Sequence, residues 1–220
     1  KMNKNIKLSY KEDISKISGK NIQRMERAFD TFEELVKDSY NENILDKKYA
    51  LDLGEGDKSF VKVLESKQFN VKGYDIDTVN FETDKLPELN DSVDIIFCNS
   101  VIEHVSDISN FFSEIYRVLK KDGILILITP NFSYDYKNFY DDPTHINPFT
   151  VTKLHEVLKL FKFNNTRIVP WVVKKSPIFW KIPFKFFICR YLLLASNDTK
   201  FPLPSFLKGQ TKTILSISKK

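Results

Sequence analysis

Short apolar runs alternate with amphipathic segments along most of this chain, and this alternation limits its fold more than any other feature. Apolar runs occupy residues 47–53, 92–100 and 124–129. Between the second and third runs, residues 107–123 place apolar side chains at helical spacing. A buried strand, a helix and another buried strand make a βαβ unit, so the sequence predicts an α/β fold with a mainly parallel sheet covered on both faces.

The remaining elements follow from the same periodicities. Expected helices cover 20–40, 57–69, 107–123 and 150–161, and expected strands cover 47–53, 70–77, 92–100, 124–129, 166–173 and 212–218. Lys120 and Lys121 suit the C-terminal end of the third helix, and Gly123 is placed to end it. With 220 residues, the chain is long enough for one domain with a real core, and we expect residues 1–220 to form it, beginning with a helical segment at 1–40.

The net charge of +5 is unevenly distributed along the sequence. Residues 171–220 contain ten Lys and Arg residues and one acid, Asp198, for a net charge of +9, so the first 170 residues carry −4. The basic C-terminal part is either a site for an anionic partner or surface, or a lysine-rich solvated tail.

The few cysteines and histidines argue against a disulfide-stapled protein and against a zinc-binding one. The two cysteines, Cys98 and Cys189, are far apart, and there are three histidines and no CxxC pair. We therefore expect no disulfide framework and no metal site. The first sixteen residues lack the apolar core of a signal peptide, which favours a cytoplasmic location.

Two glycines bracket one residue directly after the first apolar run, in ALDLGEGDK (50–58). A P-loop is excluded because Gly54 and Gly56 are too close together and no glycine directly precedes Lys58. The dinucleotide pattern G-x-G-x-x-G fails at its third position, which is Ser59. A third reading fits better: D-x-G-x-G after one strand and an acid after the next, here Asp75, suit an adenosyl group, since a carboxylate can accept hydrogen bonds from ribose hydroxyls.

Several blocks of the sequence together resemble class I S-adenosylmethionine-dependent methyltransferases, in particular the broad small-molecule group. The likeness covers residues 48–173 and the final strand, and it is carried by LDLGEG, GYDID, LPELNDSVDIIFCNSVIEHV, FFSEIYRVLKKDGILILITPN and DDPTHINPFTVTKLHEVLKLFKF. The resemblance implies a Rossmann-like, doubly wound, seven-stranded sheet that is mainly parallel with the last strand antiparallel. It also implies S-adenosylmethionine as cofactor and a small-molecule acceptor.

Three departures from the family pattern lie close to the cofactor loop. Glu55 stands where the family usually has Cys, and Lys58 stands where it usually has a third glycine. Residues 78–87 cross directly between two strands, where the family usually has a helix. Lys58 either crowds the methionine end of the site or points its stem into solvent.

The resemblance assigns cofactor contacts to nine residues. It implies that Asp52, Gly54 and Gly56 line the methionine and ribose side and that Asp75 holds the ribose, with Asp77 as a substitute. It implies further that Ile76 and Leu86 sandwich the adenine, that Asp84 meets its amino group, and that Asn99 and Ser100 lie near the sulfonium. Asp52 could instead tie down the loop backbone, and Ile76 and Leu86 could be plain core.

Two histidines are candidates for the base that removes a proton from the acceptor. By resemblance, His104 in IEHV lies at the mouth of the site, and His145 in DDPTHINPF lies on the loop where substrate enters. An imidazole suits proton transfer at neutral pH, although each could be a hydrogen-bonded structural histidine. We expect Glu103 to cap the following helix and His155 to be structural.

Residues 174–208, between the last two strands, are rich in aromatic and basic residues. We expect them to form a cap beside the carboxyl ends of the strands, because four prolines do not suit inner strands. The cap could cover an apolar acceptor, contact an anionic membrane surface or form a homodimer contact; charges exclude a spanning helix, and nucleic acid is the weakest alternative. The sequence thus predicts a methyltransferase acting on a small, amphiphilic, anionic acceptor, and the alternative is a degenerate fold that binds a ligand or partner without catalysis.

Overall fold

A single six-stranded sheet organises the part of the chain that the structure describes, residues 19–171 and 212–220 of this computed structural model. Its strand order is β2-β1-β3-β4-β6-β5. The strands are β1 (Tyr49–Leu53), β2 (Asn70–Tyr74), β3 (Val93–Asn99), β4 (Leu119–Pro130), β5 (Asn164–Pro170) and β6 (Thr213–Lys219). The first four are parallel, and β6 is antiparallel to both β4 and β5, which confirms the predicted antiparallel last strand.

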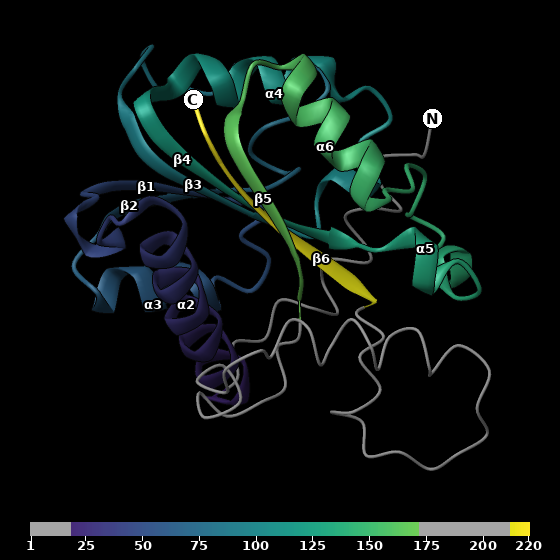
Figure 1. Cartoon of the computed structure of the whole chain (residues 1–220), viewed down its shortest axis with the longest axis horizontal. Coiled ribbons are helices and arrows are strands. Elements are labelled where there is room, and N and C mark those ends of the chain that lie inside the picture. Colours follow the sequence, from purple (N-terminus) through teal and green to yellow (C-terminus); the bar gives the residue numbers. More distant parts are fainter. Residues whose placement is uncertain (1–18, 172–211) are drawn as a thin grey trace.

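Helices cover both faces of the sheet, as the alternating pattern predicts (Figure 1). α2 (Gly19–Tyr40) and α3 (Ser59–Ser66) lie on one face, and α4 (Ile108–Val118) and α6 (Val151–Leu160) lie on the other. Short helical turns complete the described elements: η1 (Ile44–Asp46), η2 (Ile102–His104), α5 (Phe132–Asp135) and η3 (Phe139–Asp141). The chain is therefore a three-layer α/β structure.

Side-chain alternation along β4 shows how one strand supports both layers. Ile124, Ile126 and Ile128 join the apolar core under α2 and α3, while Leu125 and Leu127 join the core under α4 and α6. Because neighbouring strand residues point to opposite faces, a strand buried on both sides needs an unbroken apolar run. This requirement explains why ILILIT predicted an inner strand correctly.

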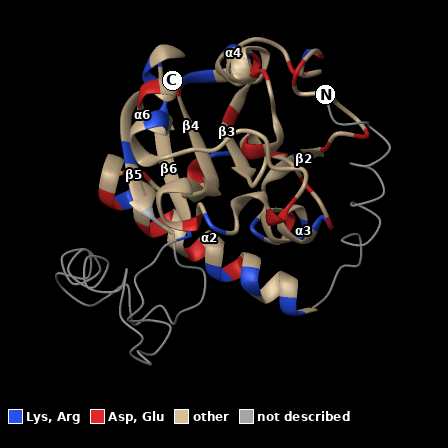
Figure 2. Cartoon of the chain, turned by 90° about the vertical axis from the view of Figure 1, so that its right-hand side faces the viewer, with Lys and Arg blue, Asp and Glu red and all other residues tan. Residues whose placement is uncertain are grey.

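The outer helix α2 confirms the sequence-predicted helix at 20–40. Its apolar residues Phe29, Phe32, Leu35 and Val36 are buried against the sheet. Figure 2 shows acidic and basic residues along the length of the same helix, as expected for a helix with one solvent face. The rest of the predicted 1–40 segment lies outside the described residues.

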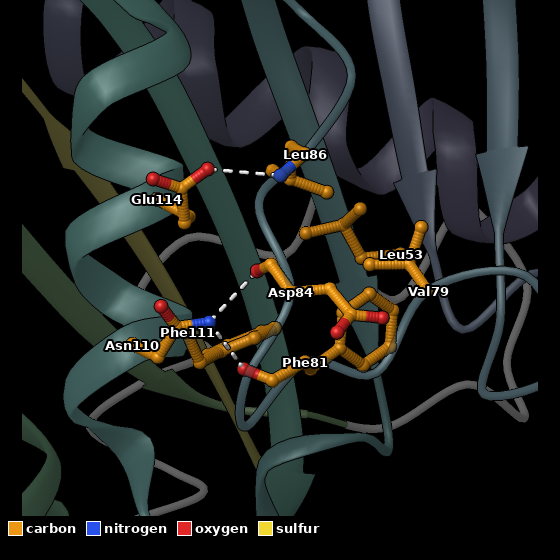
Figure 3. A pocket seen from close by; sticks show the side chains of 8 residues that line it. All are labelled: Leu53, Val79, Phe81, Asp84, Leu86, Asn110, Phe111 and Glu114. Atoms are coloured by element: carbon orange, nitrogen blue, oxygen red, sulfur yellow. Dashed lines mark hydrogen bonds between the residues drawn. The ribbon is translucent and has the colours of Figure 1, made fainter.

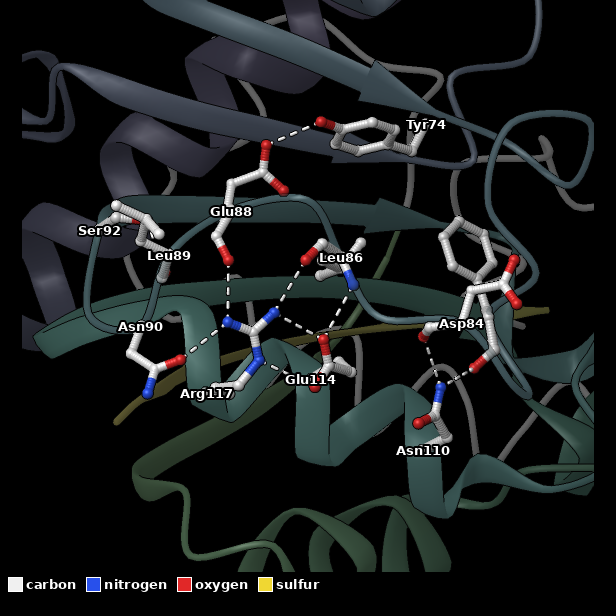
Figure 4. Close-up of polar contacts among 11 residues, drawn as sticks. Tyr74, Asp84, Leu86, Glu88, Leu89, Asn90, Ser92, Asn110, Glu114 and Arg117 are labelled. Carbon is white, nitrogen blue, oxygen red and sulfur yellow. Dashed lines mark hydrogen bonds and ion pairs between the residues drawn. The ribbon is translucent and has the colours of Figure 1, made fainter.

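The predicted number of seven strands is wrong for the described residues, which form six. Residues 75–92 add no strand, because they cross from β2 to β3 through turns. Arg117 of α4 fixes this crossing: its guanidinium donates to the carbonyl oxygens of Leu86 and Glu88 at 2.9 and 2.8 Å and forms an ion pair with Glu114 (Figure 4). A crossing held by side chains of α4 leaves β2 at the edge of the sheet.

The junction between α4 and β4 also differs from the prediction. α4 ends at Val118, and Leu119 already has extended backbone and begins β4. The pairing register with β3 shifts between Val93 and Ile95, so residues 120–123 form an irregular start to the strand and not a helix end. Asp122, with φ of 61°, takes the left-handed conformation expected of Gly123.

The predicted cap at 174–208 lies outside the described residues. The membrane, dimer and acceptor contacts expected of it lie outside them as well. Among residues 19–171 and 212–220, no helix is both long and apolar enough to cross a membrane.

Candidate functional site

Buried oxygen atoms without a hydrogen-bond partner gather where the parallel strands end. Within the described residues there are four such atoms, and three of them, Ser59 Oγ, Glu103 Oε1 and Asn131 Oδ1, follow the carboxyl ends of β1, β3 and β4. The fourth is Glu88 Oε2, on the crossing after β2. Buried polar atoms are almost always paired, so a cluster of unpaired ones at one edge of the sheet indicates a binding site.

Gly54 turns the chain tightly after β1. Its φ is 84°, and its N–H and that of Glu55 donate to the carbonyl oxygen of Tyr74 at 2.7 and 3.2 Å. A Cβ on Gly54 would overlap the Val101 side chain, just beyond β3. The loop therefore joins the ends of β1, β2 and β3, and only glycine fits at this position.

Asp75 lies beside Gly56 of the loop after β1. Asp75 directly follows β2, and its Oδ2 accepts a hydrogen bond from the Gly56 N–H at 3.1 Å. Gly56 has φ of 50°, and a Cβ there would meet one atom within 4 Å, the carbonyl oxygen of Gly54. The space above Gly56 is thus open beside a half-buried carboxylate.

Asp52 differs from Asp75 in being almost completely buried, with 3% of its surface exposed. It lies within β1, opposite Gly73 of β2 and Phe97 of β3. Burial is the main cause that raises the pKa of this carboxyl to about 8, and the negative charges of Glu55, Asp75 and Asp57 add to it. Asp52 therefore carries its proton at neutral pH in the absence of a cation.

The two departures in the glycine loop form one local arrangement. Lys58 Nζ lies 3.3 Å from Glu55 Oε1, and the lysine side chain is 62% exposed. The Glu55 side chain is 8% exposed and lies against Gly73, where any Cβ would overlap it. Of the two predicted orientations for Lys58, the structure shows the solvent-facing one.

Two predicted adenine contacts, Asp84 and Leu86, line a small pocket between the crossing and α4 (Figure 3). The full lining is Leu53, Val79, Phe81, Asp84, Leu86, Asn110, Phe111 and Glu114. Asn110 donates to the carbonyl oxygen of Asp84 at 2.9 Å, and Glu114 accepts from the Leu86 N–H at 2.8 Å. The third predicted contact, Ile76, is half-buried and does not line this pocket.

Asp84 also closes a turn of its own, because its carboxylate accepts a hydrogen bond from the Asn80 N–H at 2.9 Å. The lining residues contributed by α4 were missed from sequence because they read as parts of an ordinary amphipathic helix.

Asn99 and Ser100 lie at the carboxyl end of β3. Both are exposed at the end of β3, and Ser100 has φ of 57°. The Ser100 N–H donates to the carbonyl oxygen of Ile128 at 2.9 Å, which keeps the two strand ends together. The left-handed turn at Ser100 sends the chain into η2, where Glu103 and His104 follow.

The prediction that Glu103 caps the next helix is wrong. Asp107 is the cap of α4, accepting a hydrogen bond from the Ser109 N–H at 2.9 Å. Glu103 is fully buried instead, and its Oε2 accepts a hydrogen bond from Thr129 of β4 at 3.0 Å. Burial raises the pKa of this carboxyl to about 8, although the nearby hydroxyls of Thr129 and Ser100 oppose the shift.

His104 and His145 lie side by side, with ring centroids 4.8 Å apart. His145 Nδ1 is 2.7 Å from the carbonyl oxygen of Phe139, and a carbonyl can only accept, so Nδ1 carries the hydrogen. His104 Nδ1 is 3.1 Å from the carbonyl oxygen of Thr144 and 2.8 Å from its hydroxyl, which itself donates to Asp142. In the neutral form of both rings, Nε2 therefore holds the lone pair.

Glu103 joins this pair of histidines. One possible ligand atom of each of the three residues lies within 4.8 Å of those of the other two. The loop that brings His145 to β3 is held by the carbonyl oxygen of Glu103, which accepts from the N–H groups of Ile146 and Asn147 at 2.9 and 3.0 Å. His155 lies apart, exposed on α6 beside Glu156, as expected of a residue outside the site.

Comparison with known proteins agrees with this architecture. The sequence model of a methyltransferase domain family matches residues 9–168. The chain belongs to this methyltransferase family. The match confirms the prediction of an S-adenosylmethionine-dependent methyltransferase, with S-adenosylmethionine as its cofactor.

Individual relatives are more distant. A Mycolicibacterium smegmatis protein named as an S-adenosylmethionine-dependent methyltransferase is 37% identical over 71 residues, which are 32% of this chain and 26% of that protein. The chain therefore matches about a quarter of the length of that relative. A methyltransferase structure from Archaeoglobus fulgidus has a TM-score of 0.55 at 16% identity, covering 87% of this chain and 94% of the other.

A phosphoethanolamine N-methyltransferase from Haemonchus contortus, in complex with S-adenosylhomocysteine, has a TM-score of 0.50 at 16% identity. This likeness covers 79% of the present chain and 49% of the other. At these identities, both solved structures support the fold and say nothing about the acceptor.

Proposed function

We propose that this methyltransferase transfers the methyl group to a small acceptor that binds beside Glu103, His104 and His145. The observation that carries the proposal is the state of the two histidines, since both rings are oriented with the lone pair on Nε2. They follow the ends of β3 and β4, and the cofactor loop reaches the same edge through the contact between Gly54 and Val101. A proton acceptor thus lies beside the proposed cofactor site.

The residues at the ends of β1 and β2 fit the adenosyl group of the cofactor. Gly56 leaves open space beside the loop, and the Asp75 carboxylate lies at its rim. In the proposal, Asp52, Gly54 and Gly56 line the methionine and ribose side, and Asp75 accepts hydrogen bonds from the ribose. The remaining proposed contacts are Ile76, Asp84 and Leu86 at the adenine, and Asn99 and Ser100 near the sulfonium.

The chemistry asks little of the protein beyond alignment and proton removal. When bound, S-adenosylmethionine supplies an electrophilic methyl group on a positively charged sulfur. The chain must hold the acceptor in line with that methyl and take up its proton at His104 or His145 Nε2. The Nδ1 hydrogen bonds to Thr144 and Phe139 keep each ring in the orientation this role requires.

Apolar side chains near His145 favour an acceptor with an apolar body. Tyr136, Tyr140 and Ile146 are 54%, 60% and 41% exposed, and all belong to the loop after β4. The rings of Phe139 and His145 lie close to each other, tilted by 34° with centroids 4.7 Å apart. Exposed aromatic surface beside a site favours apolar ligands. The anionic head group proposed for the acceptor depends on the basic residues of 174–208, outside the described part of the chain.

The alternative of a degenerate, non-catalytic fold arises from Glu55 and Lys58. In the structure these two residues form an ion pair, and the Glu55 side chain packs against Gly73. Neither side chain fills the open space above Gly56. This arrangement favours catalysis over a merely structural or binding role.

Isothermal titration with S-adenosylhomocysteine, in the presence of EDTA, tests the cofactor half of the proposal. Asp75→Ala should weaken binding by roughly 1–3 kcal/mol, because it leaves ribose hydroxyls without an acceptor. Asp77→Ala, two residues further along the same turn and exposed, is the matched control and should bind like the wild type. Equal affinity of Asp75→Ala and wild type would show that the ribose is held elsewhere.

Release of S-adenosylhomocysteine in the presence of a panel of hydroxylated and amine acceptors tests the acceptor half. At least one of His104→Ala and His145→Ala should lower turnover at least about 100-fold on any acceptor that must lose a proton, the usual contribution of a positioned base. His155→Ala is the control. If His104→Ala and His145→Ala both turn over at the wild-type rate while S-adenosylhomocysteine still binds, the assignment of the base is wrong.

A further inference from the structure

Glu103, His104 and His145 offer the ligand set of a transition-metal site. Two imidazoles and one carboxylate contribute possible ligand atoms within 4.8 Å of one another. In a tetrahedral site, ligand atoms about 2.1 Å from the ion are about 3.4 Å from one another. Binding an ion would thus require the three side chains to move together by less than about 1 Å.

The orientation of both rings matches that of metal-binding histidines. Such a ligand usually donates its second ring N–H to a backbone carbonyl or carboxylate, which fixes the coordinating nitrogen. His145 Nδ1 donates to the Phe139 carbonyl at 2.7 Å, and His104 Nδ1 is 3.1 Å from the Thr144 carbonyl. Each Nε2 then carries a lone pair, although proton transfer alone would need only one such nitrogen.

The carboxylate supplies a second, independent observation. Glu103 is fully buried, and its Oε1 has no hydrogen-bond partner among the described residues, while Oε2 is held by Thr129. A buried oxygen without a partner loses its hydration and gains nothing in exchange, so it destabilises the fold. A cation bound to Oε1 would remove that cost, and Asp142 Oδ2, 3.8 Å from His145 Nε2, adds negative charge beside the same cluster.

We propose that Glu103, His104 and His145 bind a divalent first-row transition-metal ion, with Zn²⁺ as the reference ion. Two imidazoles and one carboxylate suit Zn²⁺, Co²⁺, Mn²⁺ or Fe²⁺, whereas Mg²⁺ and Ca²⁺ prefer oxygen ligands alone. Three protein ligands leave at least one coordination position open, as in catalytic metal sites. Such a site would contradict the expectation from the sequence that the chain has no metal site.

The open position suits a hydroxyl oxygen of the acceptor, and this part rests on the proposed function. A bound cation lowers the pKa of a coordinated hydroxyl, which then gives its proton to solvent. With the Nε2 lone pairs of His104 and His145 on the ion, this ionisation replaces the proton uptake that these rings provide in the metal-free chain. The oxygen then forms a bond to the methyl carbon while the carbon–sulfur bond breaks, and the sulfur keeps the electron pair as a neutral thioether. The inference therefore favours an acceptor that presents an oxygen to the ion.

Titration of the EDTA-treated, dialysed full chain with ZnCl₂ by calorimetry, and with CoCl₂ by visible absorption, tests the site. We expect one equivalent per chain in the wild type, and at least about tenfold weaker binding in His104→Ala and in His145→Ala, which each lose one ligand. His155→Ala removes the chain's one remaining histidine and should bind like the wild type. The Co²⁺ spectrum should show nitrogen and oxygen ligation without thiolate charge transfer, which would report Cys189 instead.

Glu103→Gln keeps the size of the buried side chain and removes its charge, so it should also weaken Zn²⁺ binding at least about tenfold. Thermal melts separate loss of the site from loss of the fold, because Zn²⁺ should raise the melting temperature of the wild type and of His155→Ala but not of the three site variants. Wild-type chain that binds neither ion below about 1 mM, or site variants that bind like His155→Ala, would overturn the metal site. Titration with S-adenosylhomocysteine in EDTA is independent of this result, so the metal inference can fail while the cofactor proposal stands.

Discussion

The two halves of the carboxyl edge are built in different ways. At the ends of β1 and β2, the charged residues contact the glycine loop itself: Lys58 pairs with Glu55, three positions away, and Asp75 accepts from the Gly56 N–H, nineteen positions away. At the ends of β3 and β4, His104 contacts Thr144, forty residues further along the chain, and the buried Glu103 keeps one oxygen unpaired. The first half is a backbone scaffold, and the second is a set of side chains gathered from distant segments.

This difference matches the demands of the two ligands. A cofactor of constant shape needs close approach of the backbone and a few fixed acceptors, which glycines and one strand-end acid provide. An acceptor that must lose a proton needs groups that are costly to bury and ready to interact, and unpaired polar atoms mark such places. The contact between Gly54 and Val101 is where the two halves meet.

A single added atom should change the free energy of unfolding most at the contact between Gly54 and Val101. Gly54→Ala adds a Cβ that overlaps Val101 and forces a non-glycine residue to φ of 84°, so it should lower the free energy of unfolding by about 2–4 kcal/mol. Gly56→Ala is the matched control: its φ is 50°, and its Cβ would meet one atom, at 3.9 Å, so about 1 kcal/mol is expected. Urea denaturation measures both, and equal losses would mean that the junction adjusts freely.

The same contrast decides what the sequence could and could not predict. The inner strands and α2 follow from local patterns, and the structure confirms them. Glu103 was assigned to a helix cap because an acid shortly before a helix usually caps it, yet Asp107 takes that place. Burial of Glu103 depends on Thr129 and on a loop that returns forty residues later, which no short pattern records.

Two errors in the fold have the same kind of cause. The seventh strand was expected from the family, but a crossing of residues 75–92 held by Arg117 leaves no place for it. Lys120 and Lys121 suggested a helix end, whereas pairing with β3 draws these residues into β4. In both cases a tertiary contact outweighs a local preference.

Asp52 is a buried acid of the first half, and Glu103 is a buried acid of the second. The pH dependence of the free energy of unfolding can isolate the contribution of Asp52. The pKa of Asp52 is about 8 in the folded chain and 3.8 by its ordinary value, so between these limits the folded state holds a proton that the unfolded state lacks. The contribution of Asp52 to the free energy of unfolding is therefore greatest below about pH 4, falls until the pH reaches about 8 and is constant above it. From pH 6 to pH 9 the Asp52 contribution should fall by about 3 kcal/mol.

Asp52→Asn removes this titration and nearly keeps the shape of the side chain. Urea denaturation at pH 6 and pH 9, in EDTA, should show that the variant gains about 3 kcal/mol relative to the wild type as pH rises. Glu103 is present in both proteins, so its own titration cancels in the comparison. A constant difference between the two proteins across this range would mean that Asp52 is ionised at neutral pH and has a cationic partner.

The smallest expected effect on the free energy of unfolding concerns Lys58, and it tests whether the ion pair with Glu55 holds the glycine loop together. Lys58 is the cap of α3 and has φ of 61°, a conformation that costs a side chain about 1–2 kcal/mol. Lys58→Gly relieves that strain, but it loses an exposed ion pair with Glu55 and adds freedom to the unfolded chain. The net result should be a gain of about 0.5 kcal/mol in the free energy of unfolding. Lys62→Gly, within α3, should instead lose about 1 kcal/mol, so a loss of that size in Lys58→Gly would show that the Glu55 pair holds the loop together.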